Sequence, residues 1–187
     1  QEARPPRPLS PSALDVDENV TYPPPGPAQQ EAARRGSLLH SLFERLPGVG
    51  PERRREVADR WLEKSAGIAD APIREDLVNA ALRVIDDPAF ADLFGPEALA
   101  EAPIAATLAD GRVIAGTVDR LLVRENNVEL VDFKTGRLVP ESVTQVPRAH
   151  LRQMEAYAAA LRVIFPEREV SAALLYTSGP RLIALDA

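Results

Sequence analysis

The feature that most constrains the fold is a change of hydrophobic period near residue 103. Before this point, apolar residues recur at the three- and four-residue spacing of amphipathic helices. After it, the stretch 103–136 alternates apolar and polar residues or runs apolar, and the turn signals ADGR and ENN interrupt it. The pattern predicts helices over 29–46, 52–64 and 73–86, followed by three antiparallel strands at about 103–108, 112–124 and 128–134.

The last third of the chain returns to the helical period once and then ends in strands. Apolar residues favour a helix over 148–165, and two short apolar runs predict strands over 170–177 and 181–186. We therefore expect an α/β fold in which an N-terminal helical lobe precedes a β-β-β-α-β-β core with a mixed or antiparallel sheet.

Residues 1–28 differ in composition from the rest of the chain. Proline recurs in RPPRP and YPPPGP, and proline fixes φ and removes a backbone donor. We expect an extended linker over 1–28 and one domain over 29–187. Because the first residue is Gln1 rather than methionine, we also expect the chain to be the C-terminal piece of a larger polypeptide.

Composition excludes several classes of site. The chain has no cysteine, so disulfides, thiolate zinc sites and iron–sulfur clusters held by cysteine are excluded. Within the sequence there is no G-x-x-x-x-G-K-[ST] motif for binding a nucleotide, no apolar run long enough to span a membrane and no signal peptide pattern. We expect a cytoplasmic protein. The net charge of −6 is unusual for a free-standing nucleic-acid binder, although carboxylates can build a metal site.

Two charges interrupt an otherwise apolar strand in ELVDFKTG, residues 129–136. Asp132 and Lys134 are two positions apart and therefore share one face of the strand. In the hairpin with the preceding strand, a turn centred on Asn126–Asn127 would pair Asp119 with Lys134. A turn centred on Glu125–Asn126 would instead pair Asp119 with Asp132, whereas a three-residue loop would send Asp119 to the other face.

Either two-residue turn gathers two carboxylates and an amine on an apolar face. The neighbours expected on that face are Val113, Ala115, Leu121, Val128 and Leu130. Like charges held a few ångströms apart raise one pKa unless a cation lies between them, and a divalent metal can accept both carboxylates at once. The simpler interpretation is that these acids form ion pairs with Arg120 and Lys134.

The spacing Asp–x12–Asp–x–Lys on a hairpin resembles the PD-(D/E)xK nuclease superfamily. GTVDRLLV followed by VELVDFKTGR is similar to its RecB-type branch, as are RRGSLLHSLFERLP and QMEAY. The four motifs occur in the order of that branch over about residues 34–160. Their sequences are most similar to those of the C-terminal nuclease domain of the AddA helicase–nuclease subunit. The resemblance implies a restriction-endonuclease-like core.

The resemblance also implies roles for individual residues. Asp119, Asp132, the backbone carbonyl of Phe133 and His40 would hold Mg²⁺ or Mn²⁺, and an imidazole ligand suits Mn²⁺ at least as well. Lys134 would orient or deprotonate the attacking water and offset negative charge, while Gly36 would let its helix approach the sheet closely.

The resemblance to the family assigns roles to some further residues less specifically. The family places Gln153 and Tyr157 beside the DNA strand, although helix packing is an equal alternative for Tyr157. Glu101 matches a looser family acid, and some arginines could contact phosphates: Arg34, Arg35, Arg137, Arg148 and Arg152. Most of the arginines of PERRRE, residues 51–56, are expected on a solvated helix face, and His150 has no motif.

The implied activity is metal-dependent hydrolysis of DNA, with no iron–sulfur cluster and no nucleotide in this segment. In an AddA-like protein the domain would cut a strand delivered by upstream helicase domains, with an AddB-like partner, during double-strand break repair. Two alternatives remain open. The domain could be a stand-alone RecB-like nuclease, or a non-catalytic module that docks a partner or a DNA end.

Overall fold

The computed structural model describes residues 26–185, which form helices at the start and a five-stranded sheet after them. The helices are α1 (Pro27–Arg45), α2 (Pro51–Lys64), α3 (Ala71–Ile85) and α4 (Arg148–Ile164), with short 3₁₀ helices η2 (Pro88–Phe94) and η3 (Val143–Gln145). The strands are β1 (Ala98–Thr107), β2 (Val113–Val123), β3 (Asn127–Lys134), β4 (Glu169–Tyr176) and β5 (Arg181–Leu185). The predicted element order is therefore confirmed. The expected linker lies almost wholly outside the described residues.

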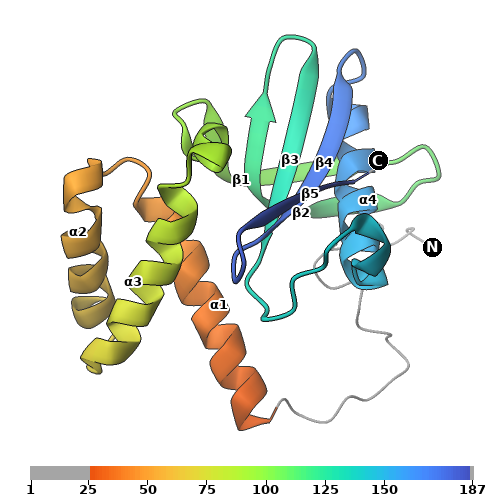
Figure 1. Ribbon diagram of the computed structural model, residues 1–187. Coiled ribbons are helices and arrows are strands. Elements are labelled where there is room, and N and C mark those ends of the chain that lie inside the picture. Colours follow the sequence, from red (N-terminus) through yellow and green to blue (C-terminus); the bar gives the residue numbers. More distant parts are fainter. Residues whose placement is uncertain (1–25, 186–187) are drawn as a thin grey trace, which may run out of the picture.

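The sheet is mixed and its strands follow chain order, β1-β2-β3-β4-β5 (Figure 1). Only β3 and β4 are parallel, and α4 makes the crossover between them. The other neighbours are antiparallel. Parallel neighbours require such a crossover, whereas the remaining strands are joined by short turns.

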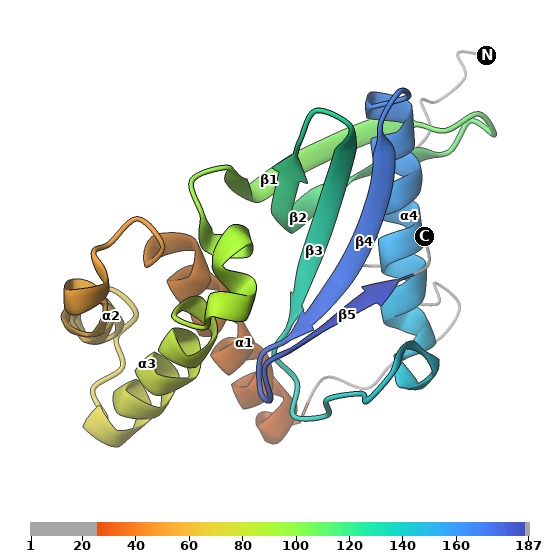
Figure 2. The ribbon, with the colours of Figure 1, turned by 45° about the horizontal axis from the view of Figure 1, so that its top comes forward.

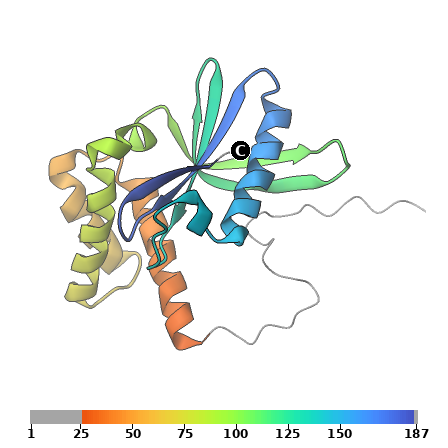
Figure 3. The same cartoon turned by 45° about the vertical axis from the view of Figure 1, so that its right-hand side comes forward.

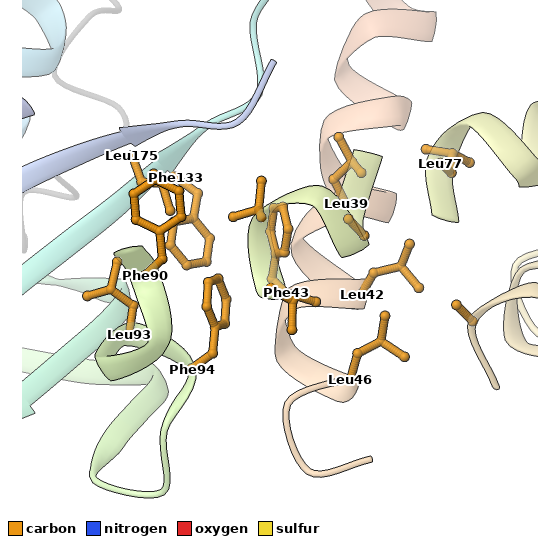
Figure 4. Packing of buried hydrophobic residues seen from close by; sticks show 14 of the residues in the cluster. Leu39, Leu42, Phe43, Leu46, Leu77, Phe90, Leu93, Phe94, Phe133 and Leu175 are labelled. Carbon is orange, nitrogen blue, oxygen red and sulfur yellow. The ribbon is translucent and has the colours of Figure 1, made fainter. Parts of the chain in front are cut away.

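Two apolar layers hold the sheet between the helical lobe and α4 (Figures 1 and 2). Alternate residues of β3 face opposite ways: Val131 and Phe133 pack against the lobe, and Val128 and Leu130 pack against α4. On the lobe side, Phe133 meets aromatic rings from α1 and η2, as Figure 4 shows. Both layers include residues of β3, so this strand is packed from both sides.

The β1–β2 pair twists sharply halfway along its length. Before Asp119, β2 buries Ile114 and Val118 against α4, but after it Leu121 faces α4 instead. On β1 the same change occurs at Glu101, which has a positive φ of 48°. The outer half of the pair consequently leaves β3 and runs across α4 (Figures 2 and 3). The acids Glu101 and Asp119 lie where the twist occurs.

This twist corrects one sequence expectation. Leu121, Val128 and Leu130 do share the face toward α4, as predicted. Val113 and Ala115 do not belong to that buried set, because they precede the twist, where Ile114 and Val118 face α4 instead. The alternation of faces predicted from the hairpin therefore holds only where β2 stays paired with β3.

Among residues 26–185, no helix is both long and apolar enough to cross a membrane.

Candidate metal centre

The hairpin of β2 and β3 has the second of the two expected registers. Val123 pairs with Val128, and the backbone N–H of Arg124 donates to the carbonyl of Asn127 at 2.9 Å, so the turn is centred on Glu125–Asn126. The ladder runs as far as Arg120 and Val131. One step further, where Asp119 and Asp132 would pair, β2 leaves β3 (Figure 2).

The carboxylate of Asp119 fills the space opened by this divergence. The backbone N–H of Phe133 donates to Asp119 Oδ2 at 2.5 Å, which satisfies a donor that the departing strand no longer pairs. Asp119 Oδ1 lies 3.0 Å from His40 Nδ1. The side chain of Asp119 is only 13% exposed, and that of His40 is 30% exposed. Asp119 therefore joins β3 to α1.

Helix α1 brings His40 to this position because of a close contact one turn earlier. A Cβ at Gly36 would lie 2.7 Å from Thr135 Oγ1, so only glycine fits there without a shift of its neighbour. This confirms the expected close approach of the helix. Burial disfavours the charged imidazole, but the hydrogen bond to Asp119 and the nearby charges of Asp132 and Glu101 raise the pKa of His40 above its ordinary value of 6.5.

Glu101 completes a cluster of three ligand-type groups. One donor atom each from His40, Glu101 and Asp119 lies within 4.8 Å of the others. Burial, and then the charge of Asp119, raise the pKa of Glu101. An imidazole and two carboxylates at this spacing form a donor set suited to Mn²⁺ or Mg²⁺, so the residues fit such an ion. The cluster opens into a cavity of about 530 Å³.

Asp132 and Lys134 face the opposite side of the site, toward α4. Lys134 Nζ lies 2.8 Å from Asp132 Oδ2 and donates to Gln153 Oε1 at 2.7 Å. The Gln153 amide donates in turn to Asp132 Oδ1 at 3.2 Å. Burial, followed by the charge of Asp119, raises the pKa of Asp132 to about 6, although Lys134 and His40 oppose the shift. The ion pair that we considered as the simpler interpretation is thus present for Asp132.

Within residues 26–185, Arg120 does not pair with a carboxylate side chain, in contrast to that simpler interpretation. Its Nη1 donates to the backbone carbonyl of Asp119 at 3.0 Å, and its Nη2 donates to that of Phe43 at 2.6 Å. The guanidinium lies over the rings of Phe94 and Phe133, 5.3 and 5.6 Å from their centroids. Arg120 is 3% exposed, so its charge is buried beside the acidic cluster.

The other residues that the sequence suggested for the site lie in different surroundings. Tyr157 is completely buried and packs against Gly116, where an added Cβ would lie 2.7 Å from the phenol oxygen, so its position matches the packing alternative. Arg137 is exposed just after β3. Arg35 pairs with Asp76 at 2.6 Å.

Sequence reasoning missed several residues that line the cavity, among them Glu44 and Thr135. Glu44 lies one helical turn after His40, and this i, i+4 spacing is a signal that could have found it. Thr135 directly follows Lys134 and forms the wall against Gly36. Nothing in the sequence pattern marks Thr135.

A mixed sheet crossed by one helix, with clustered carboxylates, an imidazole and a lysine where two strands separate, is the kind of fold and site found in metal-dependent hydrolases. Residues 14–183 match the family model described as the PD-(D/E)XK nuclease superfamily. The chain belongs to this superfamily, whose members are metal-dependent nucleases, and its core is therefore restriction-endonuclease-like.

Comparisons with individual proteins add little. No curated protein matches the chain. One solved structure that resembles it is named "Crystal structure of SSO0001"; it is 13% identical, the match covers 80% of this chain and 75% of that chain, and the TM-score is 0.35. A likeness at this level says nothing about function.

Proposed function

We propose that this chain is a Mg²⁺- or Mn²⁺-dependent deoxyribonuclease domain of the RecB-like exonuclease type. We further propose that it forms the C-terminal part of an AddA-type helicase–nuclease in double-strand break repair, with upstream helicase domains and an AddB-like partner. The observation that carries the nuclease proposal is the meeting of Asp119, His40 and Glu101 beside the Asp132–Lys134 pair. The AddA assignment rests on the four sequence motifs and their order.

The residues that would hold the ion are His40, Glu101, Asp119, Asp132 and the carbonyl of Phe133. The N–H of Phe133 points to Asp119, and the N–H and C=O of one strand residue point to the same side, which supports a role for this carbonyl. When bound, the ion would polarise a phosphoryl oxygen and make water more acidic.

Lys134 is the residue of this chain proposed to act on the reacting groups. Asp132 and Gln153 hold its Nζ in place, and Gln153 is thereby a positioning residue. In the reaction a water oxygen bonds to phosphorus, the bond from phosphorus to the leaving oxygen breaks, and a proton passes from the water to that oxygen. Lys134 Nζ would orient the water and donate to the negative charge that develops on the phosphoryl group.

A cleavage assay with matched variants tests the proposal. Labelled single-stranded DNA and blunt duplex DNA are incubated with Mg²⁺ or Mn²⁺ and with wild type, Asp132→Ala or Asp110→Ala. Asp110 is exposed and, among the residues that the structure describes, its side chain pairs only with Arg112, so its loss controls for removal of a carboxylate. We expect cleavage by wild type and Asp110→Ala and none by Asp132→Ala. Equal cleavage by all three proteins would refute the site.

The second candidate is a non-catalytic docking module that keeps the nuclease fold. One observation favours the docking module. Lys134 contacts Asp132 directly, so the lysine already neutralises one carboxylate. Calorimetric titration with Mn²⁺ separates the two candidates. Binding that disappears in Asp119→Asn supports the nuclease, and the absence of binding to wild type supports the module.

A further inference from the structure

A second hollow lies directly beside the proposed metal centre and has a different lining. It is a groove of about 720 Å³ between α1, α3 and the segment that follows β3. Thr135 lines both this groove and the metal cavity, so the two hollows adjoin at that residue. A polymer that occupied the groove would therefore pass beside the metal centre. We call it the arginine groove, after Arg35, Arg83 and Arg137 in its lining.

The three guanidinium groups come from three separate elements. Arg35 of α1 is held by Asp76 of α3 at 2.6 Å. Arg83, in the last turn of α3, and Arg137, after β3, have no side-chain hydrogen-bond or ion-pair partner anywhere in residues 26–185. Several other arginines of residues 26–185 are, in contrast, paired with acids: Arg54, Arg60, Arg74, Arg112 and Arg124.

Unpaired cations are notable here because the chain as a whole is acidic, with a net charge of −6. Of the two acids in the groove lining, Asp76 is already committed to Arg35, and Glu31 is exposed. Two free guanidinium groups from different elements thus border one hollow. Guanidinium groups bind phosphate oxygens through two parallel hydrogen bonds, so this arrangement suits an anion with several phosphates.

The groove also contains a buried hydroxyl without a partner. Thr177, after β4, is 4% exposed, and its Oγ1 has no hydrogen bond within the described part of the protein, although it lines the groove. A buried polar atom is normally satisfied, so an unpaired one beside unpaired cations is consistent with a polar ligand.

The other lining residues are small: Ala28, Ala32, Ala80, Gly136 and Ser178. No aromatic side chain among the described residues lines the groove, so bases would find no stacking surface there. The chemistry of the groove therefore suits a sugar–phosphate backbone rather than bases. Protein borders it on both sides, which favours one strand over a duplex.

We propose that the arginine groove holds the phosphodiester backbone of a single DNA strand on its way to or from the metal centre, with Arg83 and Arg137 contacting phosphates. The proposal rests on the proposed nuclease function and deepens it, because it names the form of DNA bound and its path. It also predicts binding that is independent of base sequence and strongly dependent on salt.

Equilibrium binding of the whole chain to fluorescent oligothymidylate tests the groove. The measurement is made in EDTA, so that nothing is cleaved, at several salt concentrations. The variants are Arg83→Gln, Arg137→Gln and the double variant. The control is Arg53→Gln, because Arg53 is exposed on α2, has no side-chain partner among the described residues and lies outside the groove.

We expect the double variant to bind about tenfold more weakly and its log K to depend less on log salt, by about 0.7 for each phosphate that is no longer neutralised. Arg53→Gln should bind like wild type, and unlabelled single strands should compete better than duplex. Equal binding by wild type and the double variant would overturn the proposal, as would preferential competition by duplex.

The same preparations separate this proposal from the nuclease function. If wild type binds the strand through the groove but cleaves nothing with Mn²⁺, the nuclease proposal fails and the groove stands as a strand-binding site. If wild type cleaves while the arginine variants bind normally, the groove proposal fails and the nuclease stands.

Discussion

Gly36 of α1 faces the hydroxyl of Thr135 so closely that a methyl group at residue 36 would lie 2.7 Å from Thr135 Oγ1. The contact brings the first helix against the end of β3, one helical turn before His40. Because His40 and Asp119 then meet at 3.0 Å, the absence of a side chain at residue 36 determines where the imidazole lies. Packing at Gly36 and chemistry at His40 are in this way linked.

Gly36→Ala should weaken metal binding without unfolding the protein. Alanine is a better helix former than glycine by up to about 1 kcal/mol, which offsets part of the cost of the new contact. The helix must shift slightly, or Thr135 must rotate, and His40 moves with the helix. We expect Mn²⁺ affinity to fall about tenfold by calorimetry, with a melting temperature close to that of wild type.

A second substitution at Thr135 shows whether the contact is the cause. Thr135→Ala removes the oxygen that an added Cβ would meet, while the Thr135 Cβ lies at an ordinary 3.8 Å. The double variant Gly36→Ala/Thr135→Ala should recover the affinity of Thr135→Ala alone. If the double variant stays as weak as Gly36→Ala, displacement of His40 by this contact is not the explanation.

Asp119→Asn should abolish metal binding while keeping most of the local structure. An amide oxygen can still accept from the N–H of Phe133, so the join between β2 and β3 survives. The negative charge that an ion would need is removed. We expect cleavage to fall by at least about a hundredfold and the stabilisation by Mn²⁺ in thermal denaturation to vanish. Asp110→Asn, which removes an exposed acid away from the site, should change neither.

Stability without metal should fall as the pH rises across the range in which the site loses protons. The pKa of Asp132 is raised to about 6 in the folded protein from 3.8, so the folded state holds the proton more tightly than the unfolded state does. Its favourable contribution is complete below about pH 4 and is lost as the pH rises through about 6. The raised pKa of His40 acts in the same direction, with a contribution present below pH 6.5 and lost as the pH passes the folded value.

Added metal should reverse this trend, since ligands bind metal in their deprotonated forms. The increase in melting temperature caused by Mn²⁺ should be small at about pH 5.5 and large at about pH 7.5. Thermal denaturation with and without Mn²⁺ across this range measures both effects. An increase that is constant with pH would show that these groups do not hold the ion.

Much of the fold could be predicted from sequence because period and turn chemistry are local properties. The helices α1 to α4 and the five strands follow from apolar spacing, and proline or aspartate marks the start of α3 and η2. The sequence left three hairpin registers open, two with a two-residue turn and one with a three-residue loop, and Asn126 suits either two-residue turn. Packing of the whole hairpin against two layers decides between them, and packing is not visible in a short window of sequence.

The role of Glu101 illustrates what the sequence could not show. We expected it just before the first strand, whereas β1 begins at Ala98 and Glu101 lies within it. Its φ of 48° is rare for a glutamate and has no sequence signature. The twist at this residue turns its carboxylate toward Asp119. Similarly, the choice between packing and DNA contact for Tyr157 depended on how deeply its side chain is buried, which only the three-dimensional structure reveals.

Tyr157→Phe tests that choice directly. The ring is completely buried beside Gly116, so a phenylalanine keeps almost all of its packing. If the residue serves packing, Tyr157→Phe should cleave DNA within about threefold of wild type, whereas Tyr157→Ala should lose about 3–5 kcal/mol of stability. A large loss of cleavage in a stable Tyr157→Phe protein would restore the DNA-contact interpretation.

Arg120→Met should lower stability and also change the titration of the metal centre. Methionine fills much of the space but cannot donate hydrogen bonds to the carbonyls of Phe43 and Asp119, at a cost of roughly 1.5–3 kcal/mol. The charge of Arg120 also lowers the pKa of Glu101. Its removal should raise that pKa further, so the pH midpoint of Mn²⁺ binding should move upward. Leu93→Ala, a core variant without a charge change, should lower stability but leave the pH midpoint of Mn²⁺ binding unchanged. Equal midpoints in wild type, Arg120→Met and Leu93→Ala would show that Arg120 has only a structural role.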